Sequence, residues 1–327
     1  MGRQSHTRHL DLWMNGQHVG VWSRYAVRET LTYAKEWFDA PEGRPLSLSL
    51  PFQPGNLHHQ GDAVRNYFSN LLPDSQPILQ RLALRFKTGS TDAFDLLGEI
   101  GRDCVGALQI VPQGQDPGDP FAIEGVRLNE TGVAAEIAAA IGPGGRVGRG
   151  DESRDFRISI AGAQEKTALL KMGRYWMRPT GATPTTHILK LPLGLVGNQR
   201  LDLRDSVENE WLCAQILAAY GLPVANCVIR EFGGTKALVV ERFDRRWTSD
   251  KTALLRLPQE DMCQAMGVSP LLKYEADGGP GIAQILKVLE SSEARQRDRE
   301  NFFRAQVLFW MLCAPDGHAK NFSIALQ

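Results

Sequence analysis

The sequence lacks an excess of charge, paired cysteines and long apolar runs. Lys plus Arg and Asp plus Glu each number 37, so no overall field predicts binding to nucleic acid or a membrane surface, although a local basic patch is compatible with this balance. The five cysteines are widely spaced and form no Cys-x-x-Cys pair, which argues against a disulfide framework or a structural zinc site. No run of about 18 apolar residues and no signal-peptide core is present. We therefore expect a cytoplasmic protein with no membrane partner.

What the sequence does contain is typical of globular proteins. Its 327 residues, 43% of them apolar, predict two or three structural units, each with its own core. We predict an α+β fold in which residues 1–112 form a compact α+β unit and residues 113–150 a Pro- and Gly-rich linker with a helix. Residues 151–245 read as β-rich and residues 246–327 as helical. This is the order of a bilobal kinase, which holds ATP between its lobes.

Local patterns predict the individual elements. Asn15-Gly16 separates two apolar runs and favours a type I′ hairpin, because both residues tolerate positive φ. Residues 46–50 read as a short strand that ends at Pro51. The other main patterns predict strands at residues 187–190, 227–231 and 237–243, and helices at residues 63–72, 77–86, 207–220, 259–266, 282–289 and 297–313.

The sharpest chemical signal is the segment DGHAKN, which follows a long helical pattern and contains Asp316 and Asn321. Phosphoryl transfer to a hydroxyl needs a carboxylate that orients and deprotonates the acceptor, and ligands for the Mg²⁺ that bridges the ATP phosphates. Asp316 and Asn321 have the separation that a kinase catalytic loop uses for these tasks. The alternative interpretation is a polar turn that ends a helix.

A second signal is the small-residue segment SIAGAQEK, residues 159–166, between two strand-like runs. Small residues let backbone N–H groups approach phosphate oxygens, and Lys166 adds positive charge. The segment is neither a Walker A sequence nor a Gly-x-Gly-x-x-Gly loop. A tight hairpin turn is the alternative.

Two further signals follow in the order that a kinase requires. Lys190 ends an apolar strand, where a lysine can reach ATP phosphates while a carboxylate from the next helix holds it. Glu210 is the first candidate for this carboxylate and Glu208 the second. Next, the strand of residues 239–243 changes from apolar to charged residues. At the corresponding point of a bilobal kinase, the backbone binds the adenine edge. A surface lysine and an ordinary edge strand are the alternatives.

At these residues the sequence resembles a known family. The segments SIAGAQEKTALL, HILKLP, VENEW, VERFDR, QEDMCQAMG and DGHAKNFSI closely resemble HipA, the kinase toxin of a bacterial toxin–antitoxin pair. NGQHVGVW and DCVGAL resemble the N-terminal subdomain of that family. The likeness extends from about Leu10 to the last residue, and it implies a bilobal protein-kinase-like fold with an N-terminal α+β subdomain.

The resemblance also implies roles for single residues. Asp316 corresponds to the catalytic base and Asn321 to a Mg²⁺ ligand, while Ser159 matches the serine that the family autophosphorylates. A phosphate on Ser159 adds roughly −1.5 to −2 charges, and repulsion should then expel the phosphate loop and disfavour ATP binding. The residues implied to bind ATP are Ala161, Gly162, Ala163, Gln164, Glu165 and Lys166 in the phosphate loop, Lys190, the adenine hinge Glu241, Arg242 and Phe243, and His318, Ala319, Lys320 and Asn321.

The function implied by the resemblance is Ser/Thr phosphorylation with ATP and Mg²⁺ as cofactors. The substrate class is an aminoacyl-tRNA synthetase, whose phosphorylation stalls translation. The implied partner is a helix-turn-helix antitoxin of the HipB type, and operator DNA is bound mainly through that antitoxin.

The sequence departs from the family pattern after the catalytic loop. A kinase needs a further Asp as its second Mg²⁺ ligand, and none follows before Gln327, so we expect an incomplete C-lobe. Either residues that complete the lobe are absent from this chain, or the chain is a pseudokinase that serves as an antitoxin-binding corepressor without catalysis. A small-molecule or lipid kinase is a third interpretation, against which the SIAGAQEK segment argues.

Overall fold

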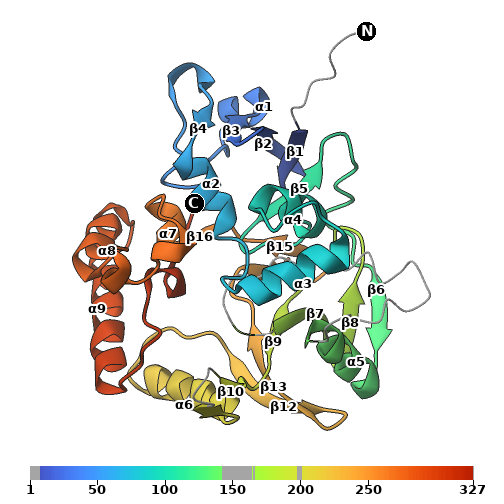
Figure 1. Cartoon of the computed structure of the whole chain (residues 1–327), viewed down its shortest axis with the longest axis vertical. Helices are drawn as coiled ribbons and strands as arrows, with labels where there is room; N and C mark the ends of the chain where they lie inside the picture. Colours follow the sequence, from blue (N-terminus) through green and yellow to red (C-terminus); the bar gives the residue numbers. More distant parts are fainter. Residues whose placement is uncertain (1–7, 142–163, 165, 197–200, 327) are drawn as a thin grey trace.

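Two antiparallel sheets organise the chain in the computed structural model, which describes residues 8–141, 164, 166–196 and 201–326 (Figure 1). Within these residues, the N-terminal sheet has the strand order β4-β3-β2-β1-β5, and a second sheet has the order β12-β13-β9-β7-β8-β6. The N-terminal sheet consists of β1 (Arg8–Met14), β2 (Gln17–Tyr25), β3 (Arg28–Tyr33), β4 (His59–Gln60) and β5 (Leu108–Pro112). The second sheet consists of β6 (Gly125–Leu128), β7 (Lys166–Met172), β8 (Tyr175–Pro179), β9 (His187–Lys190), β12 (Cys227–Phe232) and β13 (Thr235–Glu241).

The N-terminal unit follows its local patterns closely. Asn15 and Gly16 both have positive φ, 45° and 84°, so the predicted hairpin turn between β1 and β2 is confirmed. Trp22 is fully buried on this sheet and stacks on Phe68, with ring centroids 3.7 Å apart. Such a pair adds about 0.5–1.5 kcal/mol beyond its area burial. The helices that contact the sheet are α1 (Lys35–Asp39), α2 (Asp62–Ser69) and α4 (Ala93–Ile100), and α3 (Gln76–Phe86) packs on α4.

The strand predicted at residues 46–50 is wrong, because this segment forms a turn. Leu46 and Leu50 are both buried in the N-terminal core. The Tyr33 hydroxyl accepts a hydrogen bond from the Leu46 N–H (2.9 Å) and donates one to the Leu50 carbonyl (2.6 Å). These two backbone groups are therefore satisfied by a side chain and not by the backbone of a neighbouring strand. Leu48 between them is exposed, so the three leucines do not share one buried strand face, and the hydroxyl of Tyr33 holds the turn.

The segment predicted as a linker contributes to the second sheet. Strand β6 forms its edge beside β8, and α5 (Glu130–Ile141) packs Val133 and Ile137 into the core of that sheet. Later in the sequence, α6 (Ser206–Ala219) contacts β12 and β13 of the same sheet. Figure 1 shows α5 and α6 at the lower edge of the molecule, beside the strands that they contact. The domain boundaries themselves stay a prediction.

The C-terminal part is mainly helical, as predicted, with α7 (Met262–Ala265), α8 (Ile282–Val288) and α9 (Arg295–Met311). The helix predicted at residues 259–266 is wrong in its first half, because β16 (Gln259–Asp261) pairs with β17 (Ser323–Ala325). Asp261 accepts from the Gln264 N–H (2.8 Å), and the Gln264 side chain accepts from the Asp261 N–H (3.0 Å). This reciprocal capping box starts α7 at Met262 and excludes a longer helix.

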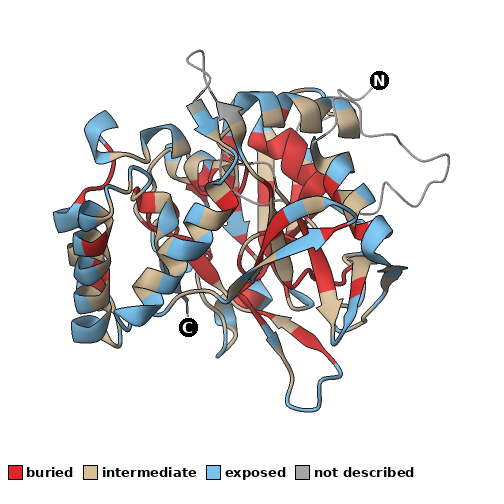
Figure 2. Cartoon of the chain, turned by 90° about the horizontal axis from the view of Figure 1, so that it is seen from below, coloured by how far each residue is buried: buried red, intermediate tan, exposed pale blue. Residues whose placement is uncertain are grey.

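Short elements complete the described part of the chain. The buried residues gather where the sheets and helices meet, and the outer helix faces are exposed (Figure 2). No helix in the described ranges is both long and apolar enough to cross a membrane. The short elements are β10 (Gly194–Val196), β11 (Leu201–Leu203), β14 (Arg245–Trp247), β15 (Leu254–Arg256) and the 3₁₀ turns η1 (Pro54–Asn56), η3 (Pro270–Leu272), η4 (Glu275–Asp277), η5 (Leu289–Ser291) and η6 (Ala319–Asn321).

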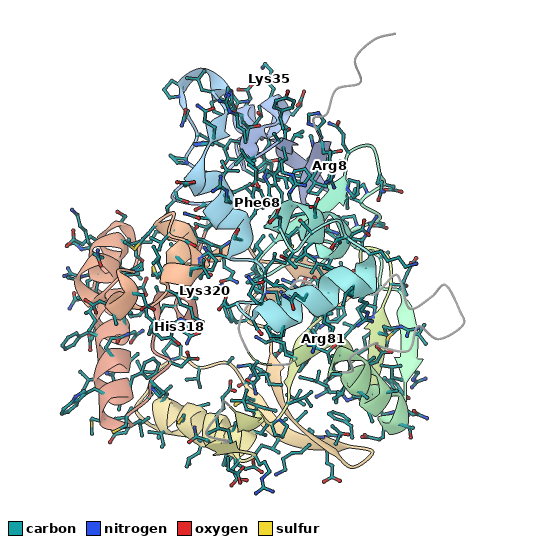
Figure 3. All side chains as sticks on the ribbon, viewed as in Figure 1. Arg8, Lys35, Phe68, Arg81, His318 and Lys320 are labelled. Atoms are coloured by element: carbon teal, nitrogen blue, oxygen red, sulfur yellow. The ribbon has the colours of Figure 1, made fainter. Side chains whose placement is uncertain are left out.

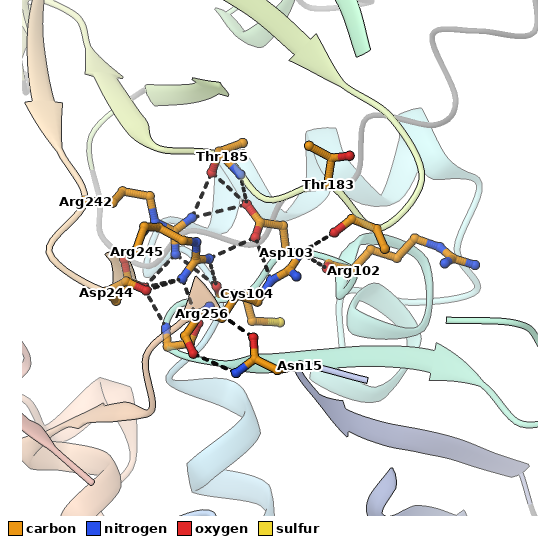
Figure 4. A network of polar contacts seen from close by, with 12 residues as sticks. Asn15, Arg102, Asp103, Cys104, Thr183, Thr185, Arg242, Asp244, Arg245 and Arg256 are labelled. Carbon is orange, nitrogen blue, oxygen red and sulfur yellow. Dashed lines mark hydrogen bonds and ion pairs between the residues drawn. The ribbon is translucent and has the colours of Figure 1, made fainter. Parts of the chain in front are cut away.

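A buried network of charges joins the N-terminal unit to the second sheet (Figure 4). We call it the Arg–Asp cluster, and its members are Asp103, Arg242, Asp244, Arg245 and Arg256. Arg242 lies 3.2 Å from Asp103 and 2.7 Å from Asp244, while Arg245 lies 2.8 Å from Asp103. Because Asp103 comes from the N-terminal unit and the others follow β13, the cluster fixes the two sheets relative to each other.

Glu260 in β16 makes a testable link between pH and stability. It is fully buried, Oε1 accepts from the Leu48 N–H (2.9 Å), and Oε2 has no hydrogen-bond partner among the described residues. Burial raises the pKa of Glu260 from its ordinary 4.5 to about 7. The folded protein therefore holds a proton that the unfolded chain releases, so stability falls as pH rises from about 4.5 to 7.

We expect Glu260→Gln to increase the free energy of unfolding above pH 7. The pKa difference corresponds to roughly 3 kcal/mol of pH-dependent stability, which glutamine removes. Burial also raises the pKa of Asp261 to about 6. The variant should therefore keep a weaker decrease of stability with rising pH. Denaturant unfolding at pH 8 measures the gain, and the same titration at pH 5 is the internal control, where the gain should be small. An equal pH dependence in both proteins would contradict this account of Glu260.

Candidate active site

Two lysines lie side by side in the second sheet. The antiparallel register of β7 and β9 pairs Lys166 with Lys190. Burial, and then the neighbouring charge of Lys190, lowers the pKa of Lys166 to about 8. Two ammonium groups in this position favour a polyanionic ligand, because phosphate oxygens would relieve their mutual repulsion.

The partner of Lys190 is Glu210 on α6, the first of the two candidates from the sequence. The second candidate, Glu208, pairs with Lys236 on β13 instead. Residues 208 and 210 lie on different sides of a helix, so each reaches a different strand. An ion pair between a strand lysine and a helix glutamate is the arrangement that protein kinases use to present a lysine to phosphates.

The loop after α9 places Asp316 between two hydrogen-bonding groups. The Tyr274 hydroxyl donates to Asp316 Oδ1 (2.9 Å), and His318 Nε2 lies 3.3 Å from the same oxygen. The interaction with His318, and then that with Tyr274, lowers the pKa of Asp316 to about 2. Its side chain is nonetheless 72% exposed. Asp316 is therefore a charged carboxylate that a substrate hydroxyl can reach.

Asn321 is held in the same loop. Its Nδ2 donates to the backbone carbonyl of Asp316, which leaves Oδ1 as the atom for a cation. Gly317 is required between them, since a Cβ at this position would lie 2.7 Å from Phe309 of α9. The close approach of loop and helix thus selects glycine in the DGHAKN segment.

His318, Ala319 and Lys320 point inward from the loop. Ala319 is buried, and the His318 ring meets the Tyr274 ring edge-on, with centroids 4.8 Å apart. Lys320 Nζ lies 2.6 Å from Asp74 Oδ1. Figure 3 shows His318 and Lys320 on the side of the C-terminal part that faces α2 and α3.

The two lysines of the sheet and the catalytic loop belong to one electrostatic environment. Besides Lys190, the charges that act on Lys166 are those of Asp74, Glu210 and Lys320. Sequence analysis missed Asp74, because the LLPDSQP segment carries no chemical pattern. It also missed Lys273 and Tyr274, which contact Asp74 and Asp316. These three residues gain a role only because α2, η3 and the loop converge.

The three residues of the predicted adenine hinge differ in their backbone and side-chain contacts. The Glu241 N–H donates to the Asn226 carbonyl (2.8 Å) and the Arg242 N–H to the Thr186 carbonyl (2.8 Å). The Arg242 side chain belongs to the Arg–Asp cluster, so this residue can reach adenine only through its carbonyl oxygen. Phe243 is exposed, and its amide stays the candidate donor.

Four residues of the predicted phosphate loop, Ala161, Gly162, Ala163 and Glu165, lie outside the described residues, and so does the predicted autophosphorylation site Ser159. Gln164 is described, and its Nε2 donates to the Leu191 carbonyl (2.5 Å), which ties the end of the loop to the end of β9.

The residues present fit a nucleotide and its cation. Lys166 and Lys190 offer charge for phosphates, and Asn321 Oδ1 offers an oxygen, the ligand type that Mg²⁺ prefers. Across the described ranges, no group of three or more His, Cys, Asp or Glu side chains forms a ready-made metal site.

The fold and site define a mixed α+β protein with a kinase-like fold. The family models "HipA N-terminal domain" and "HipA-like C-terminal domain" match residues 10–111 and 158–327. The chain belongs to the HipA family.

Its relatives include the "Putative kinase Y4mE" of Sinorhizobium fredii, 33% identical over 324 residues that cover 97% of this chain and 73% of the relative. The "Serine/threonine-protein kinase toxin HipA" of Shewanella oneidensis is 30% identical over 83% of this chain and 58% of its own length. A solved structure of the "Shewanella oneidensis MR-1 Toxin Antitoxin System HipA, HipB and its operator DNA complex" superposes with a TM-score of 0.76. It is 25% identical and covers 97% of this chain and 72% of that chain.

Proposed function

We propose that this chain is the ATP- and Mg²⁺-dependent Ser/Thr kinase toxin of a cytoplasmic toxin–antitoxin pair. The observation that carries the proposal is the ion pair of Lys190 with Glu210, beside Lys166 and in one electrostatic environment with the loop of Asp316. Membership in a family with a Ser/Thr kinase toxin supports it. Following the family, we propose an aminoacyl-tRNA synthetase as the substrate.

In the proposed mechanism, Lys190 and Lys166 bind phosphate oxygens, and Glu210 keeps Lys190 oriented toward them. Asp316 accepts a hydrogen bond from the acceptor hydroxyl and takes its proton as the oxygen attacks the γ-phosphorus of ATP, while the bond from that phosphorus to the bridging oxygen breaks and ADP leaves. Asn321 Oδ1 holds Mg²⁺, which when bound neutralises charge that develops on the phosphates. The backbone at Phe243 and the Arg242 carbonyl bind the adenine edge.

Ser159 is the proposed site of autophosphorylation. A phosphate there places roughly −1.5 to −2 charges next to the phosphate loop. This charge competes with the ATP phosphates for Lys166, so the modified protein should bind ATP weakly and be switched off.

The proposed partner is a helix-turn-helix antitoxin of the HipB type, with operator DNA bound mainly through it. The similar Shewanella protein was solved together with HipB and operator DNA, which supports this assignment. The balanced charge of the present chain, 37 basic and 37 acidic residues, favours DNA contact by way of a partner.

The kinase proposal is tested by incubating the chain with Mg²⁺ and labelled ATP and mapping phosphate by mass spectrometry. Because the chain spans 73% of the length of one relative and 58% of another, a form extended to the relatives' length is assayed in parallel. We expect label on Ser159 and none in Ser159→Ala. If neither form is labelled while antitoxin still binds, the chain is a binding module that acts as a corepressor, and the kinase proposal fails.

We expect Lys190→Ala to weaken ATP binding at least about tenfold, because the lysine contacts phosphates in a partly desolvated site. Glu210→Gln should weaken it less, since the ammonium group stays but loses its support. Lys236→Ala is the matched control: this lysine also pairs with a glutamate of α6, through Glu208, on the neighbouring strand. Titration with a fluorescent ATP analogue gives the dissociation constants. Equal losses in Lys190→Ala and Lys236→Ala would contradict the role of Lys190.

A further inference from the structure

Asp74, in the link between α2 and α3, lies between two lysines of the C-terminal part. Its Oδ1 is 2.6 Å from Lys320 Nζ and its Oδ2 is 3.0 Å from Lys273 Nζ. The side chains are only 10% exposed for Asp74 and 3% for Lys320. Burial opposes ionisation of Asp74, but Lys320 and Lys273 outweigh it and lower its pKa. The three groups therefore form a buried, ionised triad across two units of the fold.

The triad rests on a firm contact between those units. Asn70 at the end of α2 donates to the Val268 carbonyl (2.9 Å), and Asn66 donates to the Gly267 carbonyl (2.7 Å). The Asn70 carbonyl in turn accepts from Lys320 Nζ (3.3 Å). Helix α2 is thus docked on the turn after α7, and Asp74 is carried to a fixed position.

Each lysine of the triad adjoins a group that the proposed mechanism uses. Lys320 precedes Asn321 in η6, and Lys273 precedes Tyr274, whose hydroxyl donates to Asp316. The Ala319 N–H also donates to the Lys273 carbonyl (3.2 Å), which ties the two lysine-bearing segments together. One carboxylate therefore restrains both sides of the catalytic loop.

The same contacts change the interpretation of Lys320. Its ammonium group is buried and engaged by Asp74 and Asn70, so it serves as an anchor of the loop in this arrangement and is not directed to a phosphate. The Lys320 side chain is 3% exposed. Without a carboxylate partner, a charged ammonium group at this depth would cost several kcal/mol of desolvation free energy, which is about the cost of breaking a buried ion pair. Removal of the Asp74 charge should therefore displace the loop or force Lys320 toward solvent.

We propose that Asp74 is a positioning residue, supplied by the N-terminal unit, that fixes Asn321 through Lys320 and Asp316 through Lys273 and Tyr274. The inference rests on the proposed kinase function for its catalytic consequence, but the anchoring of the loop can be measured without any activity. It makes the N-terminal unit an integral part of the active site.

The test compares Asp74→Asn with Asp95→Asn. Asp95 is the matched control, because it is also buried and held by two basic side chains, Arg24 and Arg8, but these lie within the N-terminal unit. In Asp74→Asn, hydrogen exchange should rise in residues 316–325 and stay unchanged in β9 and α6. In Asp95→Asn, exchange in residues 316–325 should match that of the unchanged protein.

The catalytic readout separates positioning from nucleotide binding. We expect kcat of Asp74→Asn to fall about 10- to 100-fold, as for a small misplacement of reacting groups, while KM for ATP changes less than about threefold. Asp74→Glu should recover part of kcat, because it restores the charge. In the double variant Asp74→Asn/Lys320→Met, the loss should be smaller than the product of the two single losses, since both changes break one interaction.

The possible outcomes distinguish the two proposals. Unchanged exchange in residues 316–325 together with unchanged kcat overturns the role of Asp74 and leaves the kinase proposal intact. Increased exchange in a protein whose unchanged form transfers no phosphate supports the anchor and overturns the kinase function. If Asp74→Asn fails to fold, the double variant, which contains no unpaired Lys320 ammonium, takes its place, and unchanged exchange in residues 316–325 together with unchanged kcat in it would overturn the proposal.

Discussion

Asp316→Asn should reduce phosphate transfer by about 10²–10⁴-fold while ATP binding is retained. Asparagine has nearly the same shape and can still accept the hydrogen bond from Tyr274, but it cannot take the proton of the acceptor hydroxyl. The hydrogen bonds of Asp316 with His318 and Tyr274 lower its pKa to about 2, so the carboxylate is charged at pH 5 and above. Its protonation should therefore cause no loss of activity between pH 5 and 8.

The assay is single-turnover transfer from labelled ATP, with the dissociation constant of ATP measured in the same samples. Asp277→Asn is the matched control, because Asp277 is an exposed aspartate near the same loop and has no part in the mechanism. Full activity in Asp316→Asn would show that another group is the base. Loss of ATP binding along with transfer would instead indicate that Asp316 mainly organises the nucleotide site.

Asp103→Ala should be among the most destabilising substitutions in the chain. Asp103 is buried against Arg242, Arg245 and Arg256, and its Oδ2 also accepts from the Thr185 hydroxyl (2.6 Å). Removing one partner of a buried pair leaves uncompensated charge and costs about 3–5 kcal/mol. Since domains are stable by about 5–15 kcal/mol, a measurable fraction of the variant should be unfolded or should bind neither ATP nor antitoxin.

The dependence of the unfolding free energy on pH in acid tests the role of Asp103 independently. Burial opposes its ionisation, but Arg245, Arg242 and Arg256 hold its pKa at about 2, below the ordinary 3.8. The stabilisation from this ionised group is present above pH 3.8 and is lost as pH falls toward 2, so Asp103→Ala should lose less stability over that interval. Denaturant titrations at both pH limits measure this. Asp202→Asn removes an exposed pair with Arg204 and should change stability little. Similar losses in the two variants would contradict the importance of the Arg–Asp cluster.

Features set by neighbouring residues could be predicted from the sequence. The Asn15-Gly16 turn depends on the φ angles of two residues, and these angles are a local property. The pairing of Lys190 with Glu210 could be anticipated because a strand and the helix that follows it have few ways to pack. The separation of Asp316 and Asn321 within one short loop could be recognised for the same reason.

Other features could not be predicted, because their cause lies far away in sequence. Residues 46–50 form a turn whose partners lie elsewhere in the sequence, because Leu46 and Leu50 bond to the Tyr33 hydroxyl and the Leu48 N–H donates to Glu260. Gln259 begins a strand because the chain returns beside it at Ala325. The side chain of Arg242 faces Asp103 and Asp244 of the Arg–Asp cluster, and no local pattern indicates this contact.

The amino-acid order alone therefore predicts the kind of chemistry proposed for this protein, since residue types and their short-range spacing indicate a phosphate loop, a strand lysine and a catalytic loop. The folded chain determines how those parts are held: which glutamate meets Lys190, how Arg242 is used, and that Asp74 of the N-terminal unit supports Lys320 and Lys273. The reason is that buried charged side chains need oppositely charged partners, and the packing of the units decides which residues lie close enough to pair. No local sequence pattern specifies these long-range ion pairs.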